Sequence, residues 1–356
     1  MKRAFWGSLL LVVVTAAALV TASGASAASA PGFNIITSPL PIKLLTTPGK
    51  TISTELRMKN QSDKPEAIKV GLMKFGATGE NGEPDLFSLT PSDSYASWVH
   101  FSPSRFVAQP GIWQTVKMTI NVPSNASLGY YLAVTFSRAN TLNQQGVTNL
   151  NGSVATLVLL NVNTPNEKRT LSIASFTADH KLYEYLPANF SIRLHNSGNI
   201  YIAPAGNIFI SRGGKQVASL EFNPAGGSVL PNSNRVFTQP WSDGFPVFKP
   251  ANTTGKPVLD KHGQPKLHLS WDFGQLGKFR FGHYTAKLLV VYNNGRDDVP
   301  LQASLSFWVI PWKLLLILII FLVIIGFGLW SLLRSGVRKT RAGVSRVQKL
   351  RRHDKD

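Results

Sequence analysis

The chain has 356 residues, a formal net charge of +19 at pH 7 and no cysteine. The lack of cysteine excludes disulfides, thiol catalysis and thiolate metal sites. The basic balance favours anionic partners, such as wall polymers, acidic glycans or lipid headgroups, and the alternative is that the charge serves only solubility.

The N-terminal segment has the layout of a secretory signal. A charged start precedes an apolar run from Leu9 to Val20, and small residues follow. We predict a signal peptide over residues 1–27, with Ala25 and Ala27 flanking the cleavage position. The alternative is an uncleaved membrane helix, for which the apolar run is short. Export without disulfides fits a bacterial protein.

The middle of the chain predicts an all-β protein with two tandem immunoglobulin-like sandwiches. Short runs of alternating apolar and polar residues are separated by Gly, Pro, Asn and Asp, which is typical of strands. Two such runs end at Asn60 and Asn196, in corresponding places. We expect domains at 28–164 and 165–310, the second with an insertion near 243–266.

A second correspondence supports this duplication. The pattern Gly-x-Tyr-x-Ala opens a long run in each half, with Gly129 and Tyr131 in the first and Gly282 and Tyr284 in the second. In immunoglobulin-like sandwiches, a tyrosine near the start of strand F hydrogen-bonds back to the preceding corner. We therefore predict that the two tyrosines have this structural role.

The C-terminal segment predicts one transmembrane helix over residues 311–333. About 20 apolar residues, rising about 1.5 Å each, match the thickness of a bilayer core. The predicted anchor flanks are Trp312, Lys313, Trp330 and Arg334. Residues 334–356 contain nine Lys or Arg against two Asp, so this tail is expected in the cytoplasm and the bulk outside the cell. We thus expect a single-pass protein of the cell membrane.

No catalytic motif is present in the sequence. The seven histidines are scattered, and neither a Gly-x-Ser-x-Gly elbow nor a phosphate-binding glycine loop occurs. We predict that the protein is not an enzyme and has no cofactor, metal site or nucleic-acid partner. A wall hydrolase whose catalytic groups assemble only in space is the enzymatic alternative.

A group of aromatic residues in the first half is a candidate ligand surface. Tyr95, Trp98 and Trp113 lie close together in the sequence. Aromatic rings stack on sugar faces, which favours a glycan ligand. Core packing is the alternative, because it is the commoner use of such side chains.

The same region resembles a known family. The residues that carry this resemblance are Trp98-Val99-His100-Phe101-Ser102-Pro103, Phe106, Pro110, Trp113, Val116, Ile120, Pro123, Ala126 and Gly129-Tyr130-Tyr131-x-Ala133-Val134. They are similar to the peptidoglycan-binding domain of the WxL-associated cell-surface proteins of Gram-positive-type bacteria. The resemblance implies two sandwich domains, a C-terminal membrane span and a short basic tail. It also implies that the first domain contacts peptidoglycan and the second a host ligand or partner surface protein.

Two functions are therefore expected from the sequence. The first is a non-enzymatic, membrane-anchored surface protein whose immunoglobulin-like domains bind peptidoglycan or an anionic wall polymer, a secreted partner surface protein, or both. The alternative is a chaperone-like assembly factor that binds other surface proteins through a strand edge.

Overall fold

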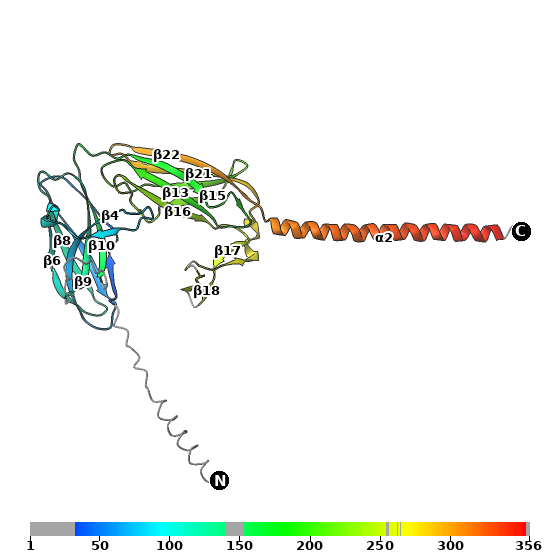
Figure 1. Ribbon diagram of the computed structural model, residues 1–356, viewed down its shortest axis with the longest axis horizontal. Helices are drawn as coiled ribbons and strands as arrows, with labels where there is room; N and C mark the ends of the chain where they lie inside the picture. The colour runs from blue at the N-terminus through cyan, green and yellow to red at the C-terminus, as the bar shows by residue number, and fades with distance from the viewer. Residues whose placement is uncertain (1–32, 140–152, 254–255, 262, 264, 354–356) are drawn as a thin grey trace, which may run out of the picture. The chain divides into compact units, whose positions relative to one another are not determined.

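The computed structural model describes residues 33–139, 153–253, 256–261, 263 and 265–353. It confirms the predicted fold class, because strands and turns occupy the chain as far as Ile310 and one long apolar helix follows (Figure 1). The chain divides into two compact units. The first contains residues up to Phe75, Leu86–Ala126 and Tyr130–Leu160, and the second contains Gly76–Asp85, Ser127–Gly129 and the chain from Asn161.

The first ten strands form two sheets. Their bounds are β1 (Ile35–Ser38), β2 (Ile42–Thr46), β3 (Thr51–Asn60), β4 (Glu66–Gly76), β5 (Asp85–Phe87), β6 (Val99–Ser102), β7 (Arg105–Ala108), β8 (Trp113–Asn121), β9 (Leu128–Arg138) and β10 (Ser153–Val162). One sheet has the order β1-β3-β8-β6, and the other has the order β2-β10-β9-β4-β5, with β7 also paired to β4. A 3-10 helix, η1 (Ser94–Trp98), leads into β6.

The remaining strands repeat this plan. Their bounds are β11 (Leu171–Ala178), β12 (Leu182–Tyr183), β13 (Ala188–Asn196), β14 (Ala205–Arg212), β15 (Lys215–Phe222), β16 (Ser233–Trp241), β17 (Val247–Pro250), β18 (Asn252–Thr253), β19 (Lys256–Pro257), β20 (Leu267–Ser270), β21 (Gly282–Asn293) and β22 (Asp298–Val309). The sheets have the orders β11-β13-β16 and β12-β22-β21-β14-β15. Both sequence halves therefore share one topology, and β17 to β20 form small hairpins inserted before β21.

The core of the second unit follows directly from the alternation in its strands. In β13, every second side chain from Ala188 to Asn196 is buried and the others are half-buried. Trp241, at the end of β16, packs its ring against Tyr284 of β21 and Phe307 of β22, with centroids 5.3 Å and 5.9 Å away. One large ring thus joins the two sheets.

A fully buried asparagine ends the equivalent strand in each half, at Asn60 in β3 and at Asn196 in β13. In the first half, the Asn60 side-chain amide donates to the carbonyls of Lys64 and Ala108 at 2.8 Å and 3.0 Å. Its side-chain oxygen accepts from the backbone N–H of Ser62 at 2.9 Å. Asparagine suits this position because one side chain provides both donors and an acceptor.

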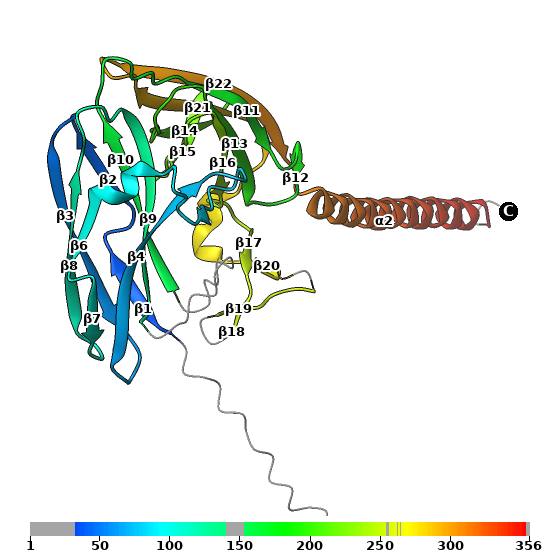
Figure 2. The same cartoon turned by 60° about the vertical axis from the view of Figure 1, so that its left-hand side comes forward.

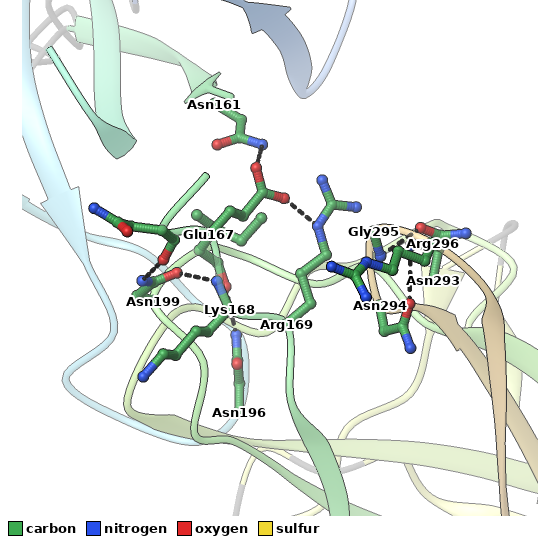
Figure 3. A network of polar contacts seen from close by, with 12 residues as sticks. Asn161, Glu167, Lys168, Arg169, Asn196, Asn199, Asn293, Asn294, Gly295 and Arg296 are labelled. Carbon is green, nitrogen blue, oxygen red and sulfur yellow. Dashed lines mark hydrogen bonds and ion pairs between the residues drawn. The ribbon is translucent and has the colours of Figure 1, made fainter. Parts of the chain in front are cut away.

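Asn196 makes the equivalent bonds in the second unit. Its amide donates to the carbonyls of Ile200 and Val229 at 2.8 Å and 2.9 Å, and its oxygen accepts from the Gly198 N–H at 2.9 Å. Gly198 is required for close approach, because a Cβ there would lie 2.3 Å from the Lys168 carbonyl oxygen. Figure 3 shows Asn196 beside Lys168 and Asn199 at this end of the unit.

Two residues separate the end of β22 at Val309 from the helix α2 (Trp312–His353). Its stretch Trp312–Leu332 has 21 residues, none buried within the protein, and is long and apolar enough to cross a membrane. It is the one such helix in the described part of the chain. The helix continues beyond this stretch into the basic tail.

Candidate partner-binding edge of the second sandwich

The sheet edges differ in how they are protected from further strand pairing. The edge strands β1, β2, β5 and β6 have three to five residues each, and short edges are poor templates for another strand. In the described chain, the long strands that end a sheet belong to the second unit and are β11, β15 and β16. In the same unit, β22 has only the two-residue β12 outside it, so it is an edge over most of its length.

Two of these long edges are protected from pairing with a further strand. At the edge of β16, the N–H of Val236 donates to the carbonyl of Glu80 at 2.6 Å. The Glu80 carboxylate also accepts from Arg193 at 2.5 Å and from the Asn234 amide at 3.1 Å. Residues 76–85 therefore cover this edge. The β15 edge has exposed charges at Lys215 and Glu221, and such charges disfavour pairing with another strand.

The β22 edge has neither a covering segment nor exposed charges along most of its length. Only Leu182 and Tyr183 of β12 pair with it, opposite Trp308 and Val309. Among the residues that the structure describes, no strand pairs with the outer side of β22 between Asp298 and Phe307. The strand has no charged residue after Asp298. It is therefore a long, uncharged edge.

The hydrogen-bonding direction along this edge follows from one observed bond. The N–H of Trp308 points away from β21, because it donates to the Lys181 carbonyl at 2.8 Å. Alternate residues of a strand direct their backbone polar groups to the same side. The N–H groups of Gln302, Ser304 and Ser306 are therefore directed outward. Pro300 falls in the same series, where its missing N–H costs no bond to β21.

Apolar side chains line the inner face of the same edge. Val299, Leu301, Ala303 and Leu305 are half-buried and pack against the core of the unit. β11 lies alongside β22 as the edge of the facing sheet, and its residues are also uncharged (Figure 2). A strand added to the outer edge of β22 would place alternate side chains over the half-buried row from Val299 to Leu305.

The aromatic residues predicted as a ligand surface are only partly brought together. Tyr95 and Trp98 lie in η1, and their rings are 6.3 Å apart. Tyr130 of β9 packs against both, at 5.4 Å and 5.0 Å. All three rings are half-buried, so they fix η1 against the sheet. Sequence reasoning missed Tyr130, because the adjacent Tyr131 matched the tyrosine-corner pattern.

Trp113 is not part of this cluster. It begins β8, whereas Val99, next to Trp98, pairs with Ile120 near the other end of that strand. At about 3.3 Å per residue, the two positions are roughly 20 Å apart. The Trp113 ring is instead covered by the guanidinium of Arg57 at 5.1 Å.

An aspartate fixes the loop that leads into η1. The Asp93 carboxylate accepts from Lys74 at 2.9 Å, from the Thr90 N–H at 2.7 Å and from the Tyr95 hydroxyl at 3.1 Å. The bond from Lys74, followed by those from Thr90, holds the pKa of Asp93 well below its ordinary value of 3.8. Burial, with the bond to Asp93, raises the pKa of Tyr95 to about 12.

The low pKa of Asp93 predicts that part of the stability depends on pH. Its ionised form is favoured in the folded state, so the contribution is fully present above the ordinary pKa of 3.8 and is lost as the pH falls below it. We expect Asp93→Asn to lower the melting temperature at neutral pH, and the difference from the wild type to shrink below about pH 4. Thermal unfolding of the full chain at both pH values would measure this.

The matched control is Asp63→Asn, which changes an exposed carboxylate for which the described residues give no ion pair. Its melting temperature should follow the wild type at both pH values. A deficit of Asp93→Asn that stays constant as the pH falls would contradict the assignment.

The two predicted tyrosine-corner positions lie near the starts of equivalent strands. Gly129 and Tyr131 are in β9, where the Tyr131 ring packs edge-on against Phe75 at 5.8 Å. Gly282 is the first residue of β21. The hydroxyl of Tyr284, which is buried, accepts from the Phe281 N–H at 3.2 Å.

The predicted membrane flanks lie in α2. Trp312 is its first residue, and the Lys313 ammonium is 2.7 Å from the Glu184 carboxylate. Arg334 lies over the ring of Trp330 at 5.1 Å. The predicted cleavage residues Ala25 and Ala27 are outside the described residues.

No family model and no curated protein sequence matches the chain. Several solved structures of chaperones do match it. The class 5 fimbriae chaperone CfaA has 15% identity and a TM-score of 0.34, over 67% of this chain and 99% of that one. The Acinetobacter baumannii CsuC–CsuE chaperone–tip complex has 12% identity and a TM-score of 0.33, over 76% of this chain and 97% of that one. The E. coli chaperone DraB has 11% identity and a TM-score of 0.32, over 78% and 100%.

These comparisons correct the main functional prediction. The prediction of peptidoglycan binding is wrong by this finding, because the structures named above are two chaperones and a chaperone–subunit complex. The geometry gives a physical reason, since two of the predicted ligand aromatics pack into η1 and the third lies elsewhere.

Proposed function

We propose that the chain is a non-enzymatic, membrane-anchored protein that holds another exported protein by strand addition at the outer edge of β22. The sandwiches lie outside the cell and the basic tail inside. This is a chaperone-like role, in which an extended segment of the client completes the sheet. The observation that carries it is the long, uncharged and largely unpaired edge of β22, which ends beside the membrane segment.

The physical argument rests on two kinds of contact. The outward N–H and C=O groups of β22 would give affinity through main-chain hydrogen bonds, as in known modes of strand addition. The half-buried row from Val299 to Leu305 would give selectivity, because a client with apolar side chains at alternate positions would cover it. The charge asymmetry around α2 supports the orientation, with the cationic tail on the cytoplasmic side.

A pair of substitutions at one position tests the edge. Ser304→Pro removes an outward N–H while sparing the ladder to β21, as the native Pro300 does. Ser304→Ala keeps the backbone donor and removes only the hydroxyl. A photo-crosslinking side chain placed at Gln302 reports what lies against the edge in living cells. We expect an adduct with an exported protein that Ser304→Pro abolishes and Ser304→Ala retains.

A crosslinker at Gln216, on the charged β15 edge, is the matched position control. We expect no adduct there. Equal adducts at both edges, or adducts at Gln302 that persist in Ser304→Pro, would rule out strand addition at β22.

A further inference from the structure

The segment between β20 and β21 exposes an unusual amount of apolar surface. It contains the 3-10 helix η2 (Phe273–Lys278). Phe273 is 66% exposed and Leu276 58%. We name these residues, with their exposed neighbours, the aromatic patch; it consists of Trp271, Phe273, Leu276, Phe279 and Phe281. A contiguous exposed apolar surface of this kind marks an interaction site in a soluble domain.

The fold places the aromatic patch at the end of the sandwich from which α2 leaves. Phe281 immediately precedes Gly282, which pairs with Val309, the last residue of β22. The Ile310 N–H then donates to the Tyr183 carbonyl at 2.7 Å. Strand order thus brings the patch to the membrane end of the sheet, and Figure 1 shows the adjacent β17 at this end.

Aromatic contacts tie the rest of the patch to the same end. The Trp271 ring lies 6.4 Å from that of Tyr185, two residues beyond β12. The backbone of Phe279 forms an isolated β-bridge with that of Phe245. The Phe245 ring lies 5.6 Å from the ring of Phe273. At the start of η2, the Asp272 side chain accepts from the Gly274 N–H at 3.1 Å, which fixes the turn. The patch is therefore held in place by its neighbours and has a defined shape.

The chemistry around the patch fits a lipid surface. Trp and Phe rings are favoured at the interface between hydrocarbon and water. Exposed lysines of the same segment are Lys249, Lys261 and Lys266, and exposed lysines complement anionic headgroups. Lys278 is also exposed but pairs with Asp243 at 2.8 Å. Exposed Leu259 and Leu267 of the neighbouring hairpins extend the apolar surface.

We propose that the aromatic patch rests in the headgroup region of the membrane that α2 crosses, as a second attachment of the second sandwich. This inference rests on the proposed membrane span. The occupant is the bilayer because the patch lies at the end of the sheet from which α2 starts, as the pairing of Gly282 with Val309 shows. Exposed Trp308 and Trp312 lie at the same end. The sandwich is then held at two points instead of swinging about Ile310 and Pro311.

Site-directed spin labelling tests this attachment. The chain has no native cysteine, so one introduced cysteine carries the only spin label. The full chain would be reconstituted in vesicles of phosphatidylcholine and phosphatidylglycerol, with a label at Phe273→Cys. Collisions with oxygen, which concentrates in lipid, and with a water-soluble nickel chelate then report depth. We expect the Phe273→Cys label to favour oxygen.

Two further labels serve as controls. Arg296→Cys lies in the turn at the opposite end of β21 and β22 and should favour nickel. Leu322→Cys, near the middle of the apolar stretch of α2, should favour oxygen strongly. Nickel preference at Phe273→Cys with oxygen preference at Leu322→Cys would overturn the second attachment alone. Nickel preference at Leu322→Cys would overturn the span, and the attachment with it.

A protein occupant would give a different result. If a second copy of the chain covered the patch, the mobility of the Phe273→Cys label would change with the ratio of protein to lipid. The proposal requires that this mobility stay constant on dilution with lipid. It also requires that the oxygen preference increase when phosphatidylglycerol is raised, because the surrounding lysines would then draw the patch closer.

Discussion

Replacing Trp241 by alanine is expected to lower the free energy of unfolding by about 3–5 kcal/mol, the usual loss for a large buried aromatic side chain. The ring is fully buried and contacts Tyr284 and Phe307 from the opposite sheet. Its removal leaves a cavity between the two sheets that rigid strands cannot close. Denaturant unfolding of the full chain in detergent, followed by near-ultraviolet circular dichroism, would measure the loss.

The matched control is Trp308→Ala in the same unit. Trp308 is 48% exposed and its side chain points out of the sheet. We expect this change to cost less than about 1 kcal/mol in detergent. Similar losses for the two variants would mean that Trp241 does not hold the sheets together.

Replacing Asn196 by alanine is expected to cost about 2–4 kcal/mol. The change leaves the carbonyls of Ile200 and Val229 and the N–H of Gly198 without their side-chain partner in a buried place. The Val229 carbonyl keeps its bond from the Ile202 N–H, but the other two groups lose a bond in a buried place, where water cannot replace it. The same unfolding experiment would measure this loss.

Asn199→Ala is the control, because Asn199 makes side-chain bonds of the same kind, one from the Lys168 N–H and one to the Asn166 carbonyl, but in a half-exposed place. Water can replace those bonds, so a loss below about 1 kcal/mol is expected. Asn60→Ala should resemble Asn196→Ala, because the two buried asparagines have equivalent partners. A small effect of Asn196→Ala would refute the view that these bonds are structural.

The fold could be predicted because its signals are local. Alternation of period two marked the runs that became β3 and β13, and their final residues, Asn60 and Asn196, marked the duplication. The strands predicted from Gly129 and Gly282 correspond to β9 and β21. An uninterrupted apolar run of about 20 residues marked the helix in the same way.

The candidate edge could not be predicted in the same way. Whether an edge is open depends on which strands pair, and pairing joins residues far apart in the chain. Glu80 covers β16 through Asn234, 154 residues away, and no local pattern marks that contact. The aromatic patch did leave a signal, because residues 271–281 are rich in aromatic residues and lack alternation, but only the fold shows that they stay exposed.

The connection between β22 and α2 has a mechanical consequence. Two residues, Ile310 and Pro311, separate them, and such a link extends by at most about 7 Å. A client strand bound along β22 would be loaded in shear, and its tension would pass straight down that strand into the lipid anchor. The other strands of the sandwich would bear little of it. Such an arrangement suits a protein that holds its client under tension, because the short link hardly extends before the force reaches the membrane helix.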